Sequence, residues 1–127
     1  MSGKARPSTA IFTRLVRRAK APAMTEAAFQ SQVTGLAQLL GWHWLHLRPA
    51  VTASGWRTAI SGPLGKGWPD LFMARPRDGR VIAAELKRDG ARTTPDQDAV
   101  LDVLRASGVE VHVWRPADFD RIAEVLR

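Results

Sequence analysis

The sequence has no cysteine, no tyrosine and no long apolar run. Without thiols it can form neither disulfides nor thiolate metal sites, so any bound metal ion must take oxygen or imidazole ligands. No apolar run approaches the roughly 20 residues of a membrane-spanning helix, and the basic N-terminus lacks the apolar core of a signal peptide. We therefore expect a cytoplasmic protein with no membrane segment. Its 127 residues suffice for one domain with a real core.

Acidic residues are absent from the first 24 positions, which makes the charge distribution uneven. This stretch holds six basic residues, whereas the rest of the chain is nearly neutral although the net charge is +7. We expect residues 1–22 to form a basic N-terminal arm, partly disordered or a short helix, and residues 23–127 to form the folded domain. Such an arm fits binding to a polyanion such as DNA, and a solubilising tail is the alternative. The arm residues predicted to bind DNA are Arg14, Arg17, Arg18 and Lys20.

The apolar pattern of residues 23–127 predicts an α/β domain. Helical spacing begins after Thr25, and a second helix begins with the capping pair Thr94 and Gln97. The expected helices cover 25–40, 94–107 and 118–126, and the expected strands cover 42–48, 71–75, 81–87 and 109–114. The order is αβββαβα, and the helical crossover between the last two strands implies that they are parallel. The fold class is therefore a mixed β-sheet with flanking helices.

Two carboxylates are expected to meet where two of these strands pair. The second and third strands flank an Asp-Gly turn signal, which favours an antiparallel hairpin. Such a hairpin brings Asp70, at the start of one strand, near Glu85, toward the end of the other. Side chains two apart in a strand share a face, so Lys87 lies on the face of Glu85 and Leu86 packs on the opposite face.

The trio Asp70, Glu85 and Lys87 predicts a metal-dependent site that acts on phosphodiesters. Two carboxylates and the backbone carbonyl of Leu86 suit Mg²⁺ or Mn²⁺, which prefer oxygen ligands. The ion polarises a phosphate and lowers the pKa of a bound water, and Lys87 orients that water or balances charge on phosphorus. A chance Glu-x-Lys ion pair on an exposed strand is the alternative. The apolar run before Glu85 argues against it, because a charged pair at the end of a buried strand needs a partner.

Residues 49–66 are rich in small and polar residues and are expected to form a long loop, here called the flap. Loops of this length in compact domains usually have a function or are mobile. Because the flap leads to Asp70, we expect it to contact the substrate. Outside the arm, the residues predicted to bind DNA are Arg57 and Lys66 in the flap and Arg88 and Arg92 in the basic turn after Lys87.

The segments Gly67-Trp68-Pro69-Asp70 and Glu85-Leu86-Lys87, followed by Gln97, resemble the PD-(D/E)xK nuclease superfamily. The resemblance is greatest to its VRR-NUC family of small stand-alone phage and bacterial proteins, and it covers residues 25–127. Glu26 matches that family's first acidic position. The resemblance implies a restriction-endonuclease-like core and catalytic roles for Glu26, Asp70, Glu85, Lys87 and Gln97. It also makes Glu26 a further candidate metal ligand. On the residues alone, Glu26 also suits a helix dipole and Gln97 also suits a helix cap.

The same resemblance implies Mg²⁺- or Mn²⁺-dependent cleavage of DNA. It further implies selectivity for branched substrates such as four-way (Holliday) junctions, and a homodimer with two active sites. Two other functions stay open at the level of sequence. One is a non-catalytic DNA-binding protein with a nuclease-like fold, and the other is a nuclease that acts on linear duplex ends or on RNA.

Five tryptophans and three histidines complete the set of residues that attract interest. Trp42, Trp44 and Trp114 are expected in the core, and Trp68 is expected to pack under the flap. His46 is left open between packing and a role in the site, because it lies either on the face of Trp42 and Trp44 or at the rim near the flap.

Overall fold

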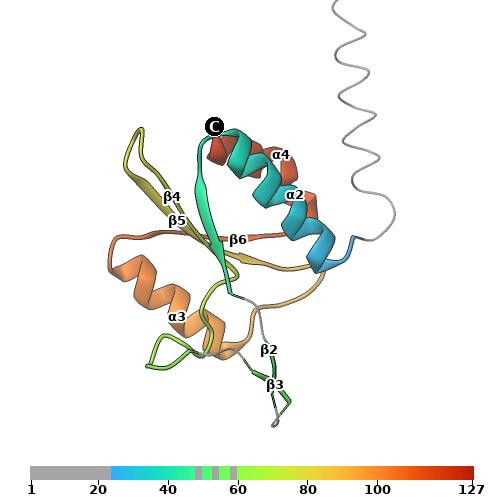
Figure 1. The fold of residues 1–127 in the computed structure, drawn as a ribbon, viewed down its shortest axis with the longest axis vertical. Coiled ribbons are helices and arrows are strands. Elements are labelled where there is room, and N and C mark those ends of the chain that lie inside the picture. Colours follow the sequence, from blue (N-terminus) through green and yellow to red (C-terminus); the bar gives the residue numbers. More distant parts are fainter. Residues whose placement is uncertain (1–23, 48–49, 53–54, 58–59) are drawn as a thin grey trace, which may run out of the picture.

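A four-stranded mixed sheet forms the centre of the protein, and helices cover both of its faces (Figure 1). The computed structural model describes residues 24–47, 50–52, 55–57 and 60–127, with the backbone alone for 50–52 and 55–57. The strands, in spatial order, are β1 (His43–His46), β4 (Leu71–Arg75), β5 (Arg80–Leu86) and β6 (Glu110–Trp114). The helices are α2 (Glu26–Leu39), α3 (Pro95–Ala106) and α4 (Phe119–Leu126), and the short 3₁₀ turn η1 (Pro116–Asp118) precedes α4. The predicted mixed α/β architecture is confirmed.

Both strand pairings that the sequence predicted are present, and the pairing of β1 with β4 was not predicted. β4 pairs antiparallel with both β1 and β5, and β5 pairs parallel with β6. In the central hairpin, Leu71 pairs with Ala84. The next position outward therefore sets Asp70 opposite Glu85, at the end of the hairpin far from its turn.

The central strand β5 is buried on both faces. Helices α2 and α4 lie side by side on one face, and α3 covers part of the other (Figure 1). Ala84 and Leu86 belong to the core beneath α2 and α4, whereas Ala83 packs with α3. Because side chains alternate along a strand, Glu85 points to the α3 face.

Capping residues fix the ends of the helices that border the site. The Thr25 hydroxyl accepts a hydrogen bond from the Ala28 amide at the start of α2 (3.1 Å). At α3, Thr94 and Gln97 form the predicted capping box, with Pro95 at the first helical position. The starts of both helices could therefore be predicted from the sequence, because capping depends on residues three apart.

The flap differs from its prediction as a plain loop. It contains two short paired strands, β2 (Ala50–Thr52) and β3 (Gly55–Arg57). The two residues between them, Ala53 and Ser54, lack the Asn-Gly or Asp-Gly signal that marks a tight hairpin in sequence. The pairing of these strands was for that reason not apparent from the residues.

Three of the four tryptophans whose surroundings were predicted follow the prediction. Trp42 and Trp114 are each 3% exposed, as expected for core residues. Trp68 packs against Phe72 with ring centroids 5.6 Å apart, which confirms a packing role. The prediction for Trp44 is wrong, because this side chain lies on the edge strand β1 and is 40% exposed. Across the described residues, no helix has both the length and the apolar character needed to span a membrane.

Candidate active site

Asp70 lies one residue before β4 and is held from two sides. Its carboxylate oxygen Oδ2 accepts a hydrogen bond from the Leu86 amide at 2.9 Å. Its backbone carbonyl lies 2.9 Å from Nδ1 of His46. The predicted approach of Asp70 to the end of β5 is thus confirmed, and Leu86 contributes its amide to the contact.

Glu85 is a buried carboxyl beside a second carboxylate. The residue is 1% exposed, and within the described part of the chain its Oε2 atom has no hydrogen-bond partner. Burial raises the pKa of Glu85 to about 9, and hydrogen bonding and charge repulsion from Asp70 act in the same direction. A buried polar atom without a partner is rare in native proteins, because it costs the full desolvation free energy of that atom.

Lys87 and Glu26 border this pair. The Lys87 amide extends the β5–β6 ladder by donating to the Trp114 carbonyl at 3.0 Å. The charge of Lys87 lowers the pKa of Glu85, and the charge of Glu26 raises it more weakly. Both side chains therefore lie within electrostatic reach of Glu85, as the sequence predicted.

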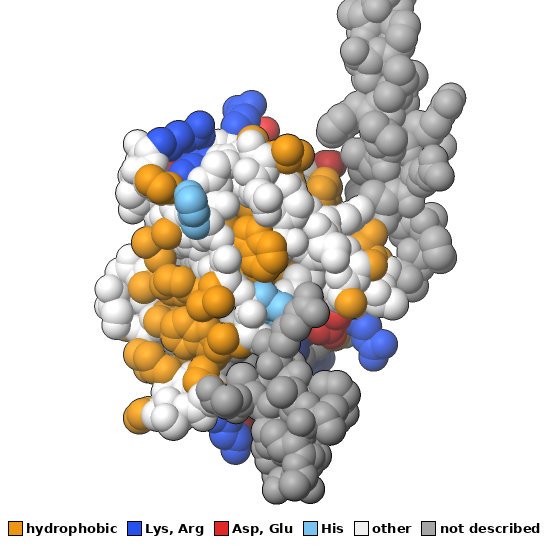
Figure 2. All heavy atoms as spheres, viewed as in Figure 1, with side chains coloured by type: hydrophobic (Ala, Val, Ile, Leu, Met, Phe, Trp, Pro, Cys, Tyr) orange, Lys and Arg blue, Asp and Glu red, His pale blue; other side chains and the backbone are white. Residues whose placement is uncertain are grey.

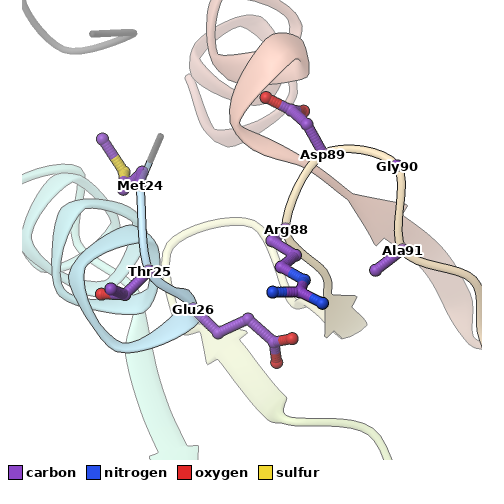
Figure 3. Close-up of a pocket in the computed structure, with 7 residues that line it drawn as sticks. All are labelled: Met24, Thr25, Glu26, Arg88, Asp89, Gly90 and Ala91. Atoms are coloured by element: carbon purple, nitrogen blue, oxygen red, sulfur yellow. The ribbon is translucent and has the colours of Figure 1, made fainter. Parts of the chain in front are cut away.

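A cavity of about 750 Å³ opens between the start of α2 and the turn after β5. Glu26 and Arg88 extend into it from opposite sides (Figure 3). The remaining lining residues are Met24, Thr25, Asp89, Gly90 and Ala91. The structure thereby joins a predicted acidic site residue to a predicted DNA-binding residue on one concave surface.

Gln97 is committed to the cap of α3. Its Oε1 accepts from the Thr94 amide at 2.9 Å, and its own amide donates to Thr94 Oγ1 at 3.2 Å. The capping interpretation is confirmed, and no hydrogen bond among the described residues joins the Gln97 side chain to Asp70 or Glu85.

The loop that carries Asp70 rests on the first turn of α3 at Gly67. A Cβ atom placed on Gly67 would lie 2.3 Å from the Asp96 carbonyl oxygen and 2.9 Å from the Gln97 amide. Gly67 also has a φ of 96°, in the left-handed region that favours glycine. Only glycine fits this position, which lies three residues before Asp70.

Three of the eight basic residues predicted to bind DNA have side chains in the described part of the structure. Lys66 forms an exposed ion pair with Asp96 at 3.4 Å, and Arg88 and Arg92 are exposed. The Arg57 side chain lies outside the described part of the structure, as do the arm residues Arg14, Arg17, Arg18 and Lys20.

Arg115 is a site-supporting residue that the sequence did not indicate. Its guanidinium donates two hydrogen bonds to the Ala91 carbonyl, at 3.1 and 2.7 Å. The Asp89 carboxylate in turn accepts from the Ala117 amide at 3.1 Å. The turn after Lys87 is thus tied to the segment between β6 and α4. A bond to a backbone carbonyl leaves no signal in sequence spacing.

The donor set at Asp70 and Glu85 fits a divalent cation. Two adjacent carboxylates repel each other, and the Oε2 atom of Glu85 is without a partner in the described structure. Across the described residues, no three His, Cys, Asp or Glu side chains come together as a metal-binding group. In the described structure Glu26 is therefore not grouped with Asp70 and Glu85, and its role as a metal ligand stays a prediction. A pair of carboxylates still suits Mg²⁺, which keeps several of its waters.

Comparison with known proteins identifies the family. The family model of the VRR-NUC domain matches residues 27–118. A solved structure described as a VRR_NUC domain protein has a TM-score of 0.55 at 22% identity and covers 83% of this chain and 87% of its own. That likeness shows the shared fold. Among curated proteins, none matches the sequence. The family match confirms the resemblance seen in the sequence, and the chain belongs to the VRR-NUC domain family, which is of nuclease type.

Proposed function

We propose that the protein is a Mg²⁺- or Mn²⁺-dependent DNA endonuclease that cleaves branched DNA. The observation that carries the proposal is the pairing of Asp70 with Glu85, whose pKa is raised and whose Oε2 atom has no partner among the described residues. A purely structural carboxyl would be expected to find a donor, because burying a polar group without one is costly. A bound cation would explain why two carboxyl groups lie together at the end of the central β4–β5 hairpin.

Different residues of the site would bind the ion, orient its ligands and balance charge on the phosphate. Asp70, Glu85 and the Leu86 carbonyl would hold the ion, which supplies polarisation of the phosphate and a bound water of lowered pKa. The Leu86 amide fixes one oxygen of Asp70 at 2.9 Å, which restricts how that carboxylate can turn. Lys87 sets a positive charge beside Glu85 and is positioned to offset charge that develops on the phosphate.

The neighbouring cavity gives the DNA a place to approach. Arg88 extends into it (Figure 3), and Arg92 is exposed just beyond the lining residues in sequence. Lys66, four residues before Asp70, is also exposed. Contacts from such residues to phosphates fix the register of DNA without reading its sequence. We therefore propose that the shape of the DNA, and not its base sequence, governs which substrate is cleaved.

The proposed working unit is a homodimer. A domain of this size covers little of a four-way junction, and a two-fold dimer places two active sites against two opposed strands. Apolar side chains gather on one side of the described surface (Figure 2). Among the exposed apolar side chains are Leu39, Leu45 and Val103, which are 85%, 54% and 51% exposed. Exposed apolar surface of this kind is what a second copy would cover.

One cleavage assay tests the activity. The full chain is incubated in Mg²⁺, Mn²⁺ or EDTA with labelled nucleic acids. The substrates are a four-way DNA junction, a DNA duplex with a single-stranded branch, linear duplex DNA, single-stranded DNA and RNA. We expect paired nicks in opposed strands of the junction with either metal and none in EDTA. Asp70→Asn should abolish cleavage. The matched control Asp102→Asn should not, because Asp102 forms only an exposed pair with Arg105.

Other results would redirect the proposal. Preferred cleavage of linear duplex or of RNA would reject the proposed junction substrate but would keep the proposed nuclease activity. A monomeric mass by light scattering would reject the proposed homodimer. Binding of DNA without cleavage under any metal would reject the enzyme and favour a DNA-binding protein with a nuclease-like fold.

A further inference from the structure

His46 marks the point where the ladder between β1 and β4 ends. It is the last residue of β1 and pairs with Leu71, the first residue of β4. Asp70 therefore lies one residue beyond the paired strands. The half-buried His46 ring turns to the Asp70 carbonyl, with Nδ1 at 2.9 Å from that oxygen. A side chain gives the carbonyl its partner where the ladder stops.

The direction of this hydrogen bond follows from its acceptor. A carbonyl oxygen can only accept, so Nδ1 of His46 carries the hydrogen and donates. Asp70 therefore accepts hydrogen bonds from two neighbouring strands. β1 holds its carbonyl through His46, and β5 holds its carboxylate through the Leu86 amide at 2.9 Å.

The ring itself lies on the wrong face of the sheet to act on substrate at Glu85. Residues directly opposite each other in paired strands share a face, so His46 lies in a row with Leu71 and Ala84. That row packs beneath α2 and α4, and His46 lines a cavity of about 380 Å³ that α2 borders. Glu85 follows Ala84 in β5 and points to the opposite face.

We propose that His46 is a positioning residue, which sets the Asp70 carboxylate by fixing its peptide group. This inference rests on the proposed metal site. Without the hydrogen bond, the residue just before β4 is free to turn about its backbone, and its carboxylate moves relative to Glu85. Outer partners that orient a metal ligand typically change metal affinity or activity by about 10–100-fold when removed.

The test compares four substitutions in the full chain, with Mn²⁺ affinity measured by calorimetry and cleavage measured in single turnover. His46→Ala should weaken Mn²⁺ binding by about 10–100-fold. His46→Asn should restore most of the loss, because its amide nitrogen occupies the place of Nδ1. His46→Gln should not, because its amide nitrogen lies one bond farther out. His43→Ala, at an exposed histidine of the same strand, is the matched control and should bind like the parent.

Thermal unfolding of each variant separates positioning from folding. A packing role predicts that affinity follows stability across the series, whereas positioning predicts that Asn and Gln differ in affinity at similar stability. Equal losses in His46→Ala and His46→Asn, or parental binding and cleavage in His46→Ala, would overturn the inference alone. If the parent neither binds Mn²⁺ nor cleaves DNA, the proposed function fails, and the positioning role fails with it.

Discussion

At the scale of single residues, Glu85 shows a conflict between stability and chemistry. Its carboxyl is buried, lies beside Asp70 and has a pKa raised to about 9. Such an arrangement destabilises the ionised, metal-free protein, and local conflicts of this kind concentrate at functional sites. The consequence is a pH-dependent stability that removal of the charge should abolish.

The metal-free protein should lose stability as the pH rises from 4.5, the ordinary pKa of this carboxyl, to about 9. In this window the folded state retains a proton at Glu85 that the unfolded state has released, so its free energy of unfolding falls with rising pH. Glu85→Gln should flatten this dependence and make the metal-free protein more stable than the parent at pH 8. Urea denaturation in EDTA at pH 5 and pH 8 measures both effects.

Glu124→Gln serves as the control for that measurement, because the Glu124 side chain is 67% exposed and forms only a loose pair with Arg127. Glu124→Gln should therefore keep the pH dependence of the parent. A parent whose free energy of unfolding falls no more between pH 5 and pH 8 than that of Glu85→Gln would contradict the assignment of a buried neutral carboxyl.

Lys87→Ala should lower the single-turnover rate by about 100-fold or more, which is the scale of losing one electrostatic stabiliser. Binding of DNA should change little, because one phosphate contact is a small part of the total affinity. Rates are measured with saturating enzyme, and affinity is measured by fluorescence anisotropy in Ca²⁺. Arg121→Ala is the control, since Arg121 is an exposed basic residue on α4 to which no role in the site is assigned. A Lys87 variant that loses affinity but keeps its rate would show that the lysine serves binding.

The sequence predicted those residues whose roles follow from strand parity. Asp70, Glu85 and Leu86 meet as expected because alternation and an antiparallel hairpin dictate it. His46 could not be assigned, because its role depends on where β1 ends. Arg75 was missed for a similar reason. Its buried guanidinium donates to the carbonyls of Leu40 and Leu126 at the ends of α2 and α4, which are partners far away in sequence.

At the scale of secondary-structure elements, the start of α3 organises the site. Its capping box was evident from residues three apart. The contact of Gly67 with this first turn was not evident, because it joins backbone to backbone. The flap strands also escaped prediction, since short strands that lack a turn signal are set by their pairing. Elements with local sequence signals were thus predictable. The contacts between elements could be identified only from the three-dimensional structure.

Gly67→Ala should destabilise the protein by roughly 1–3 kcal/mol, the usual cost of a strained backbone position, and should also impair cleavage by moving Asp70. The added methyl would lie 2.3 Å from the Asp96 carbonyl oxygen. Gly62→Ala is a matched control, because Gly62 has a similar φ of 98° but nothing within 4 Å of an added Cβ. Urea denaturation measures both variants. Equal losses in the two would mean that backbone strain alone, and not contact with α3, makes glycine necessary.

At the scale of the whole molecule, charge is divided between two parts of the chain. The arm carries six basic residues and no acid, whereas the domain that holds the site is nearly neutral. We therefore expect long-range attraction to DNA to come mainly from the arm and catalysis to depend on residues of the sheet. This division predicts that affinity and catalysis can be separated by truncation.

Deletion of residues 1–22 removes all six basic residues of the arm. Affinity for every DNA should weaken, and the slope of log affinity against log salt should become shallower by up to about 5, since each neutralised phosphate contributes about 0.9. Fluorescence anisotropy across a salt series measures the slope.

A full-length variant with the six residues changed to Gln is the control, and it should match the deletion if charge is the cause. Single-turnover cleavage at saturating enzyme should survive in both. An unchanged slope would assign the arm to solubility, and a shift from dimer to monomer by light scattering in the deletion alone would assign it to assembly.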